Sequence, residues 1–303
     1  MRRELAWGDV PNLRDLGGLP GRKGRTRFGR VARGPRRESL DATGWRGAAA
    51  WGLRTIIDLR CDYEIGSQDG DPVAWIPDTV TVVQAPTEDH EDPAFQQTCF
   101  PILDSPAYWP HNLRLLPDLV RGTLEAIAEE EPGVLVHCSA GRDRTGMVSA
   151  ILLANAGVAP EVIADDHELS VRAMAGRASH APTYDAQTTW GEQEIDEWVD
   201  TTRPLVIWFA RDVPGHLDAL GLGDATGQAA LTTAGLNSQW LSAPAEACVL
   251  AAAAAPSRPW CESSLPPRDH CRTGTRHRVP PGPGALQALR GRSGAWRPGI
   301  AAR

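Results

Sequence analysis

One short segment limits what this chain can fold into more than any other. Residues 134–146 read Val-Leu-Val-His-Cys-Ser-Ala-Gly-Arg-Asp-Arg-Thr-Gly, and residues 147–156 after them are almost wholly apolar. The aliphatic run at the start predicts a buried strand, and the apolar run at the end predicts a helix buried on all sides. A strand, a tight loop and a helix N-terminus in succession turn backbone N–H groups toward an anion. The segment therefore predicts a phosphate site.

The side chains of this loop also suit covalent chemistry. Cys138 opens the loop and Arg144 follows six residues later. A thiolate at a helix N-terminus beside an arginine is a nucleophile that can attack phosphorus. The planar guanidinium of Arg144 can hold two phosphate oxygens, and Gly141 lets the loop turn its amides inward. The alternative is a buried structural cysteine followed by an unrelated arginine, which requires strand, spacing and helix to coincide by chance.

These residues resemble a known family. The segment His137–Gly146 is similar to the His-Cys-x-x-Gly-x-x-Arg-Thr-Gly loop of cysteine-dependent protein tyrosine phosphatases, and its fuller form resembles a bacterial branch of that superfamily. Members of the branch hydrolyse phosphotyrosine and in some cases phosphoserine, phosphothreonine or phosphoinositides. Lys-Asp usually precedes the loop arginine there, whereas this chain has Arg142-Asp143. The charge is kept, but the substrate preference is left open.

The loop chemistry and the resemblance agree on the central roles. Cys138 is expected to be the nucleophile, and Arg144 is expected to stabilise the phosphoryl transition state together with the loop amides. No metal ion or cofactor is expected. His137 is expected to support the loop, whose remaining residues are expected to bind phosphate: Ser139, Ala140, Gly141, Arg142, Thr145 and Gly146.

A second motif lies near the start of the chain. Residues 12–18 read Asn-Leu-Arg-Asp-Leu-Gly-Gly. From the residues alone they predict a loop with an internal Arg14–Asp15 pair. They also resemble the Asn-x-Arg-Asp-Leu-Gly-Gly opening of the same bacterial family, which packs near the active site. Arg14 and Asp15 are therefore expected to support the site.

A third motif follows a predicted strand at residues 54–60. Asp58-Leu59-Arg60 with Glu64 resembles the Asp-Leu-Arg-x3-Glu pattern of the family. Asp58 and Arg60 are expected either to orient the phosphate loop from below or to form only a structural ion pair at the strand end.

The leaving oxygen must receive a proton, and no Trp-Pro-Asp acid loop is visible in the sequence. Asp143 is the preferred candidate for this general acid, because the loop itself brings it to the pocket. Asp104 is the alternative. Asp143 could also be a carboxylate that only shapes the loop.

The order of predicted elements indicates an α/β fold, with a mainly parallel central sheet flanked by helices as in protein tyrosine phosphatases. Residues 1–241 are expected to form the catalytic domain, and the Pro/Arg/Ala-rich residues 242–303 a disordered basic tail. Residues 87–109 are expected to be irregular. Further predicted elements are a strand at 80–83 and helices at 40–51, 115–130, from Pro160 onward and 194–209. Residues 216–236 are expected to close the domain.

Charge is spread unevenly along the chain. The net charge is +7 over residues 1–46, −21 over residues 47–255 and +7 over residues 256–303. An acidic body disfavours non-specific nucleic-acid binding, so no nucleic-acid partner is expected.

The six cysteines form no zinc-type spacing or disulfide framework, and a catalytic thiolate suits a reducing compartment. No stretch is long and apolar enough to cross a membrane, and the first residues lack an apolar signal core. A cytoplasmic location is therefore expected. The oligomeric state is left undetermined.

The sequence thus predicts a phosphate monoester hydrolase that acts most readily on protein phosphotyrosine. A phosphoinositide or dual-specificity phosphatase is the first alternative, because Arg142 would add charge at the pocket rim. A catalytically weak phospho-binding module is the second. A P-loop nucleotide hydrolase is excluded, because no Gly-Lys-Ser/Thr motif is present.

Overall fold

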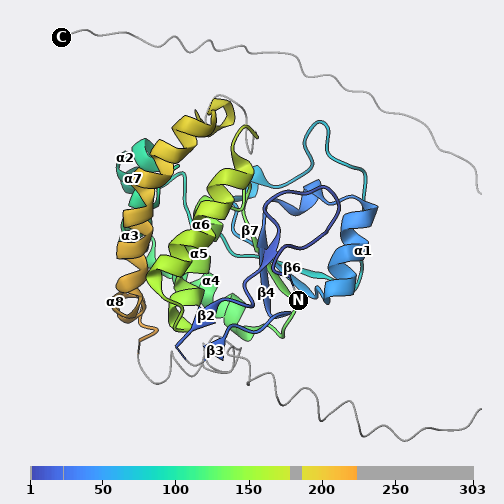
Figure 1. The fold of residues 1–303 in the computed structure, drawn as a ribbon, viewed down its shortest axis with the longest axis horizontal. Coiled ribbons are helices and arrows are strands. Elements are labelled where there is room, and N and C mark those ends of the chain that lie inside the picture. The colour runs from blue at the N-terminus through green and yellow to red at the C-terminus, as the bar shows by residue number, and fades with distance from the viewer. Residues whose placement is uncertain (1, 23, 178–185, 224–303) are drawn as a thin grey trace, which may run out of the picture. The chain divides into compact units, whose positions relative to one another are not determined.

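A five-stranded sheet lies at the centre of the computed structural model, which describes residues 2–22, 24–177 and 186–223 (Figure 1). Four neighbouring strands are parallel, and the short first strand is antiparallel to its neighbour. The mainly parallel α/β architecture predicted from the sequence is confirmed. In spatial order the strands are β1 (Arg14–Asp15), β4 (Val31–Gly34), β7 (Val134–His137), β5 (Thr55–Asp58) and β6 (Thr81–Gln84).

The sheet is buried on both faces. Val136 and Ile57 belong to a large core on one face, while Leu135 and Ile56 belong to a smaller core on the other. Successive strand residues point to opposite faces, so a strand covered on both sides must be apolar throughout. This is why β5 and β7 read as continuous apolar runs rather than as alternating ones.

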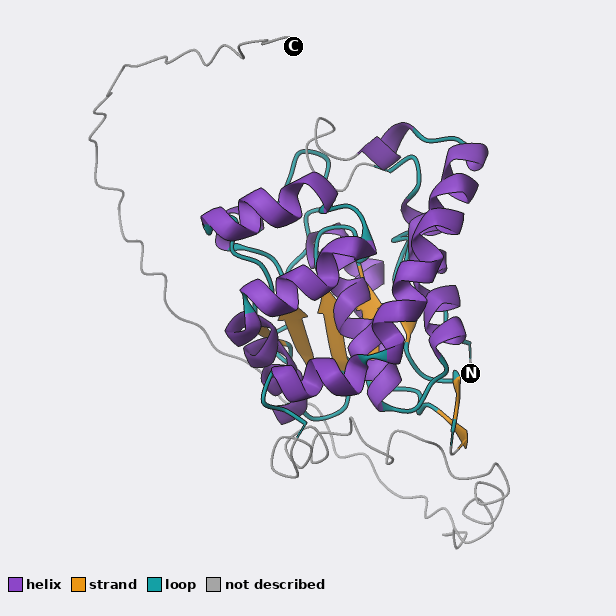
Figure 2. Cartoon of the chain, turned by 90° about the vertical axis from the view of Figure 1, so that its left-hand side faces the viewer, coloured by secondary structure: helices purple, strands orange, loops and turns teal. Residues whose placement is uncertain are grey.

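Helices cover the two faces unequally (Figures 1 and 2). Helix α1 (Ala42–Trp51) packs on the smaller core. The larger core is built with α2 (Pro93–Cys99), α3 (Trp109–Leu115), α4 (Pro117–Glu129), α5 (Asp143–Asn155), α6 (Pro160–Met174), α7 (Glu192–Arg211) and α8 (Val213–Ala219).

Short elements connect these layers. Strands β2 (Pro20–Gly21) and β3 (Gly24–Arg25) pair as a small antiparallel ribbon. Single turns of 3-10 helix occur at η1 (Arg37–Ser39), η2 (Asp62–Glu64), η3 (Phe100–Ile102), η4 (Pro106–Tyr108) and η5 (Ala186–Thr189).

Helix α5, which follows the predicted phosphate loop, is the most deeply buried of the described helices. Every residue from Arg144 to Leu153 is buried, which confirms the predicted helix buried on all sides. It contacts α6, α7, α8 and the strands β4 and β7. The helix begins at Asp143 rather than at the apolar Met147, so the end of the phosphate loop is already its first turn.

Two predictions of local structure were wrong. Residues 87–109 are not irregular throughout, because α2 lies within them. Its start is capped by the Asp92 side chain, which accepts a hydrogen bond from the Phe95 amide at 2.7 Å, and Pro93 is its first residue. Proline at this position starts a helix rather than breaking it. Residues 12–18 are also not purely loop, because Arg14 and Asp15 form β1.

The other predicted elements that lie within the described residues are present with small shifts of their ends. Gly52 ends α1 in the left-handed conformation at φ 101°, as the C-terminal glycine predicted. Among the residues described, no helix has the length and apolarity that a membrane crossing requires. The predicted boundary at 241/242, the tail and most of residues 216–236, which were expected to close the domain, lie outside the described residues.

Candidate active site

The carboxyl end of β7 opens onto a cavity of about 750 Å³. The ends of parallel strands are where an open α/β sheet binds its ligands. The phosphate loop supplies one wall of the cavity, with Cys138, Ser139, Ala140, Arg142, Asp143 and Arg144. Segments after β5 and β6 supply the rest: Tyr63, Glu88, His90, Phe100, Pro101, Leu103 and Asp104. The cavity thus gathers residues that are up to 81 positions apart in the chain.

The loop after β7 has one conformation that only glycine suits. Cys138 is buried, with 2% of its surface exposed. Gly141 has φ +68°, and a Cβ there would lie 2.2 Å from the Gly34 carbonyl oxygen. Both the left-handed backbone and the close approach of β4 therefore require glycine. Thr145 and Gly146 lie behind the loop in the buried first turn of α5 and do not line the cavity.

Two carboxylates fix the guanidinium of Arg144. Its Nη2 donates to Glu64 Oε1 at 2.7 Å, and its Nε lies 3.6 Å from Glu88 Oε2. Burial alone would lower the pKa of Arg144, but the charge of Glu88 and the hydrogen bonds to Glu64 raise it. Ser139 Oγ also donates to Glu64, at 3.3 Å. The arginine is therefore charged and held in place at the cavity wall.

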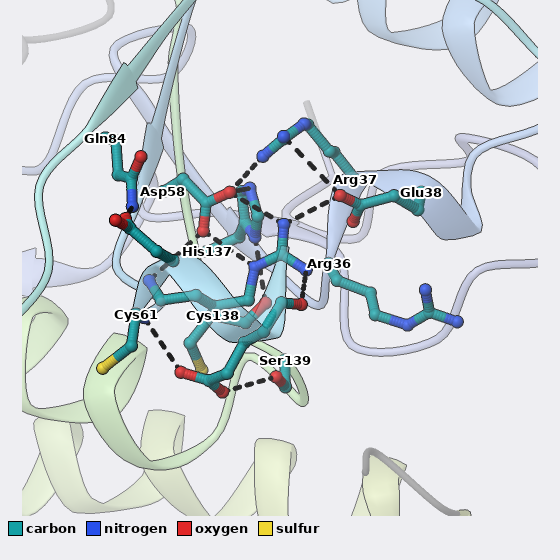
Figure 3. Close-up of polar contacts among 12 residues, drawn as sticks. Arg36, Arg37, Glu38, Asp58, Cys61, Gln84, His137, Cys138 and Ser139 are labelled. Atoms are coloured by element: carbon teal, nitrogen blue, oxygen red, sulfur yellow. Dashed lines mark hydrogen bonds and ion pairs between the residues drawn. The ribbon is translucent and has the colours of Figure 1, made fainter. Parts of the chain in front are cut away.

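A second ion-pair cluster, centred on Asp58, adjoins His137 and the start of the loop (Figure 3). Asp58 accepts hydrogen bonds from Nε and Nη2 of Arg60, both at 2.8 Å, and another from Arg37. Burial would raise the pKa of Asp58, but the bonds from Arg60 and the neighbouring charges lower it to about 2. Asp58 Oδ2 also lies 3.6 Å from His137 Nε2. Asp58 and Arg60 thus form an ion pair that also adjoins the strand leading into the loop.

His137 lies between this cluster and Cys138. Its Nδ1 lies 2.9 Å from the Cys138 carbonyl oxygen, and since a carbonyl can only accept, Nδ1 carries the proton. Burial lowers the pKa of His137 to about 4. Another buried histidine, His167 on α6, packs against Trp109 and has its pKa lowered by burial to about 3. Both imidazoles are therefore neutral at pH 7.

The predicted Arg14–Asp15 pair is absent from the structure. Arg14 instead donates to Asp166 on α6, with Nε 2.9 Å from Oδ1. Asp15 accepts from the amides of Gly17 and Gly29 at 2.7 and 2.8 Å and does not line the cavity. Neighbouring strand residues point to opposite faces, so Arg14 and Asp15 on β1 face away from each other. Arg14 thus pairs with Asp166, a partner that the sequence did not indicate.

Arg142 does not stand at the rim as a free charge. Only 3% of it is exposed. Its Nε donates to Asp143 Oδ1 at 3.1 Å and its Nη1 to Gln187 Oε1 at 2.6 Å. Both candidates for the general acid, Asp143 and Asp104, line the cavity. The geometry therefore brings both carboxylates to the same space as Cys138.

Aromatic residues complete the outer wall of the cavity. Tyr63 and Phe100 are 69% and 44% exposed. The rings of His90 and Phe100 meet edge to face with centroids 5.1 Å apart. His90 Nε2 also lies 2.9 Å from Glu88 Oε2, and its other nitrogen meets the Tyr63 hydroxyl. Sequence reasoning missed this wall, because no motif marks residues that come from two separate segments, one after β5 and one after β6.

No three His, Cys, Asp or Glu side chains of the described residues form a group that could hold a metal ion. The cysteines Cys61, Cys99 and Cys138 are free thiols. Cys261 and Cys271, whose spacing is not that of a zinc site, lie outside the described residues.

Comparison with known proteins adds two findings. A family model described as the tyrosine phosphatase family matches residues 5–213. A protein of Cupriavidus necator named "Putative tyrosine-protein phosphatase" is 31% identical over 172 residues, which are 54% of this chain and 61% of that protein. The chain thus spans less than two thirds of the length of this curated relative.

The strict need for glycine at position 141 predicts the effect of a single methyl group. Gly141→Ala should weaken binding of inorganic phosphate at least ~10-fold, because its Cβ would displace the loop from Gly34, and misplacements of about 1 Å are costly in such sites. Gly176→Ala is the matched control, since Gly176 has φ +69° but nothing within 4 Å of its Cβ position. Isothermal titration calorimetry would measure both. Equal affinity in the two variants would contradict this account.

The two neutral histidines predict how stability depends on pH. Their folded-state pKa values lie below the ordinary 6.5, so between about pH 6.5 and 4 the unfolded chain binds protons that the folded chain does not. The free energy of unfolding should therefore fall as the pH falls through this window, by up to ~1.4 kcal/mol per pH unit for each histidine. Urea titrations at pH 7, 6 and 5 would measure this slope.

A variant separates the two contributions. His167→Gln should reduce the slope by up to ~1.4 kcal/mol per pH unit, and His111→Gln, at a partly exposed position on α3, is the matched histidine substitution. A stability that does not change between pH 6.5 and 5 would show that the buried imidazoles accept protons freely in the folded state.

Proposed function

The chain belongs to the tyrosine phosphatase family, and from this membership we propose that it hydrolyses phosphate monoesters, above all phosphotyrosine in proteins, through a phosphocysteine intermediate. One observation supports the proposal most. Cys138 and Arg144 line a single cavity, and an aromatic wall stands at its mouth.

The proposed reaction has two steps. In the first, the Cys138 thiolate attacks phosphorus, so that an S–P bond forms while the P–O bond to the leaving group breaks. Asp143 gives its proton to the leaving oxygen. Arg144 and the loop amides hold the three remaining phosphoryl oxygens. In the second step Asp143 takes a proton from water, whose oxygen attacks phosphorus, and phosphate and the thiolate are released.

The aromatic wall favours an aryl phosphate over an alkyl one. Tyr63, His90 and Phe100 stand at the cavity together with the loop. Aromatic pairs contribute about 0.5–1.5 kcal/mol beyond the burial of area. A phosphotyrosine ring that reaches Cys138 would pass these side chains, whereas a phosphoserine is too short to contact the loop and the wall together.

The charges around the cavity weigh against the phosphoinositide alternative. Arg142 is already bonded to Asp143 and Gln187. Glu88, Asp104 and Asp143 also line the cavity. An inositol headgroup with several phosphates would meet these carboxylates, and like charges repel. Protein phosphotyrosine is therefore the proposed substrate class, and comparing initial rates on a phosphotyrosyl peptide and on phosphoinositide vesicles would test the choice.

Replacing the nucleophile separates an enzyme from a binding module. Cys138→Ser should reduce hydrolysis of p-nitrophenyl phosphate to the background rate while phosphate binding remains, because a serine hydroxyl is a far weaker nucleophile than a thiolate. Cys99→Ala is the matched control, because Cys99 is buried in the main core. Phosphate release would be followed by absorbance. Wild-type protein that binds phosphate without turning over any ester would instead indicate a binding module.

The assignment of the general acid predicts a dependence on the leaving group. Asp143→Asn should slow phenyl phosphate by ~10²–10⁴-fold, the usual contribution of a placed acid. It should slow substrates with very acidic leaving groups much less, since these need little protonation. Asp104→Asn is the matched variant in the same cavity. Rates across a series of substituted phenyl phosphates would be compared, and equal slowing by Asp143→Asn throughout would leave Asp143 with a structural role only.

A further inference from the structure

A buried carboxylate behind the phosphate loop forms ion pairs with three arginines. Asp166 on α6 is 1% exposed. It accepts from Arg14, with Nε 2.9 Å from Oδ1 and Nη2 3.0 Å from Oδ2, and from Arg33, with Nη1 2.8 Å from Oδ2. Arg3 donates to the same carboxylate. These charges lie 133 or more positions from Asp166 in the chain, so only the fold brings them together.

Two arms lead from Asp166 to the same part of the phosphate loop. In the first, Nη2 of Arg33 donates to the Gly141 carbonyl oxygen at 2.8 Å. In the second, Nη1 of Arg14 donates to Asn12 Oδ1 at 2.5 Å. The Asn12 amide nitrogen then donates to the carbonyl oxygens of Ala140 and Gly141, at 2.9 and 3.2 Å. Both arms end on loop carbonyl groups.

Because the peptide group is planar, holding the two carbonyl oxygens in place also fixes the direction of the N–H groups that follow them. In a planar trans peptide the C=O and the next N–H point in opposite directions. The Ala140 carbonyl shares its peptide with the Gly141 N–H, and the Gly141 carbonyl shares its peptide with the Arg142 N–H. When the two oxygens are held on the side of Asn12 and Arg33, the two N–H groups point away from that side.

We propose that Asp166, Arg33 and Asn12 are positioning residues that hold the Gly141 and Arg142 amides toward the bound phosphoryl group. This inference rests on the proposed phosphatase function of the same site. These three residues lie outside the phosphate-loop motif, so the loop conformation depends on side chains that the motif does not include.

Two observations set the network apart from ordinary scaffolding. A buried cluster of one carboxylate and three guanidinium groups is costly to desolvate, and apolar residues of similar volume often serve stability as well or better. Asn12 has φ +61°, and it is the non-glycine residue with positive φ among those that the structure describes. Unusual backbone of this kind persists where the surroundings require it, and here the surroundings are Ala140, Gly141 and Arg14.

Asn12 permits a sharp test. Asn12→Asp keeps the size of the side chain and an oxygen to accept from Arg14, but it replaces the donor to the two carbonyls with a second oxygen. Asn12→Gly removes the donor and suits the positive φ, so it relieves backbone strain. Asp166→Asn removes the charge at the centre of the network. Asp165→Asn is the matched control, because Asp165 is the preceding residue, is 62% exposed and pairs with Arg203 at the surface.

The full chain with each substitution would be titrated with tungstate, a tetrahedral oxyanion, by calorimetry. Turnover of p-nitrophenyl phosphate would be measured in parallel, and circular dichroism would establish that each variant is folded at the assay temperature. The two Asn12 variants and Asp166→Asn should lose ~10–100-fold in tungstate affinity and in kcat/KM, a loss typical of groups that orient ligands from behind. Asp165→Asn should keep both values.

The outcomes are distinct. Folded Asn12 variants with wild-type tungstate affinity would overturn the proposal, even if Asp166→Asn fails to fold. Loss of stability with unchanged affinity and kcat/KM would likewise overturn it, because the network would then serve only the fold. If the wild type turns over no phosphate ester but tungstate affinity still falls in the Asn12 variants, the proposed function fails while the positioning role is supported.

Discussion

The contact between β7 and α5 is the constraint on which the site depends. β7 is hydrogen-bonded on both sides, to β4 and to β5, and α5 is buried along its length. The loop between them therefore has both of its ends fixed by the core. A loop anchored in this way can present its amides and Arg144 to an anion without first being ordered, which avoids an entropic cost on binding.

Three clusters of charged side chains surround this loop, and each lies next to a different part of it. Glu64 and Glu88 fix the guanidinium of Arg144, while Asp58 and Arg60 lie below His137. The Asp166 cluster lies behind the carbonyls of the loop. Removing one partner from a buried ion pair destabilises a protein more than replacing both partners does. Each group therefore depends on all of its members to hold its side chains in place.

The cavity itself combines opposite requirements. The proposed reaction requires its floor to attract a phosphoryl dianion, yet Glu88, Asp104 and Asp143 line its walls. Glu88 is close to Arg144, and Asp143 to Arg142, so much of the acidity is balanced by arginine within the wall. Helix α5 begins at Asp143, which lines the cavity, so the positive end of its dipole adjoins the same space. This arrangement agrees with the proposed substrate class, a single phosphate on an aromatic ring.

The sequence by itself determined what lies in one contiguous stretch. The strand, the loop and the buried helix at residues 134–156 follow from an apolar pattern and from a spacing that is local in the chain, and the motif indicates the family. The strands β5 and β6 and the helices α1 and α4 follow from the same kind of local pattern. α2 was missed because residues 87–109 were expected to be irregular, although Pro93 stands at a capped helix start.

Only the tertiary structure decided which distant side chains meet. The sequence predicted an ion pair between Arg14 and Asp15. Adjacent strand residues point to opposite faces, however, and Arg14 instead pairs with Asp166. The aromatic wall comes from the segments after β5 and β6, whose approach depends on the order of strands in the sheet. Local periodicity carries no information on such pairs, since they are fixed by packing between elements far apart in the chain.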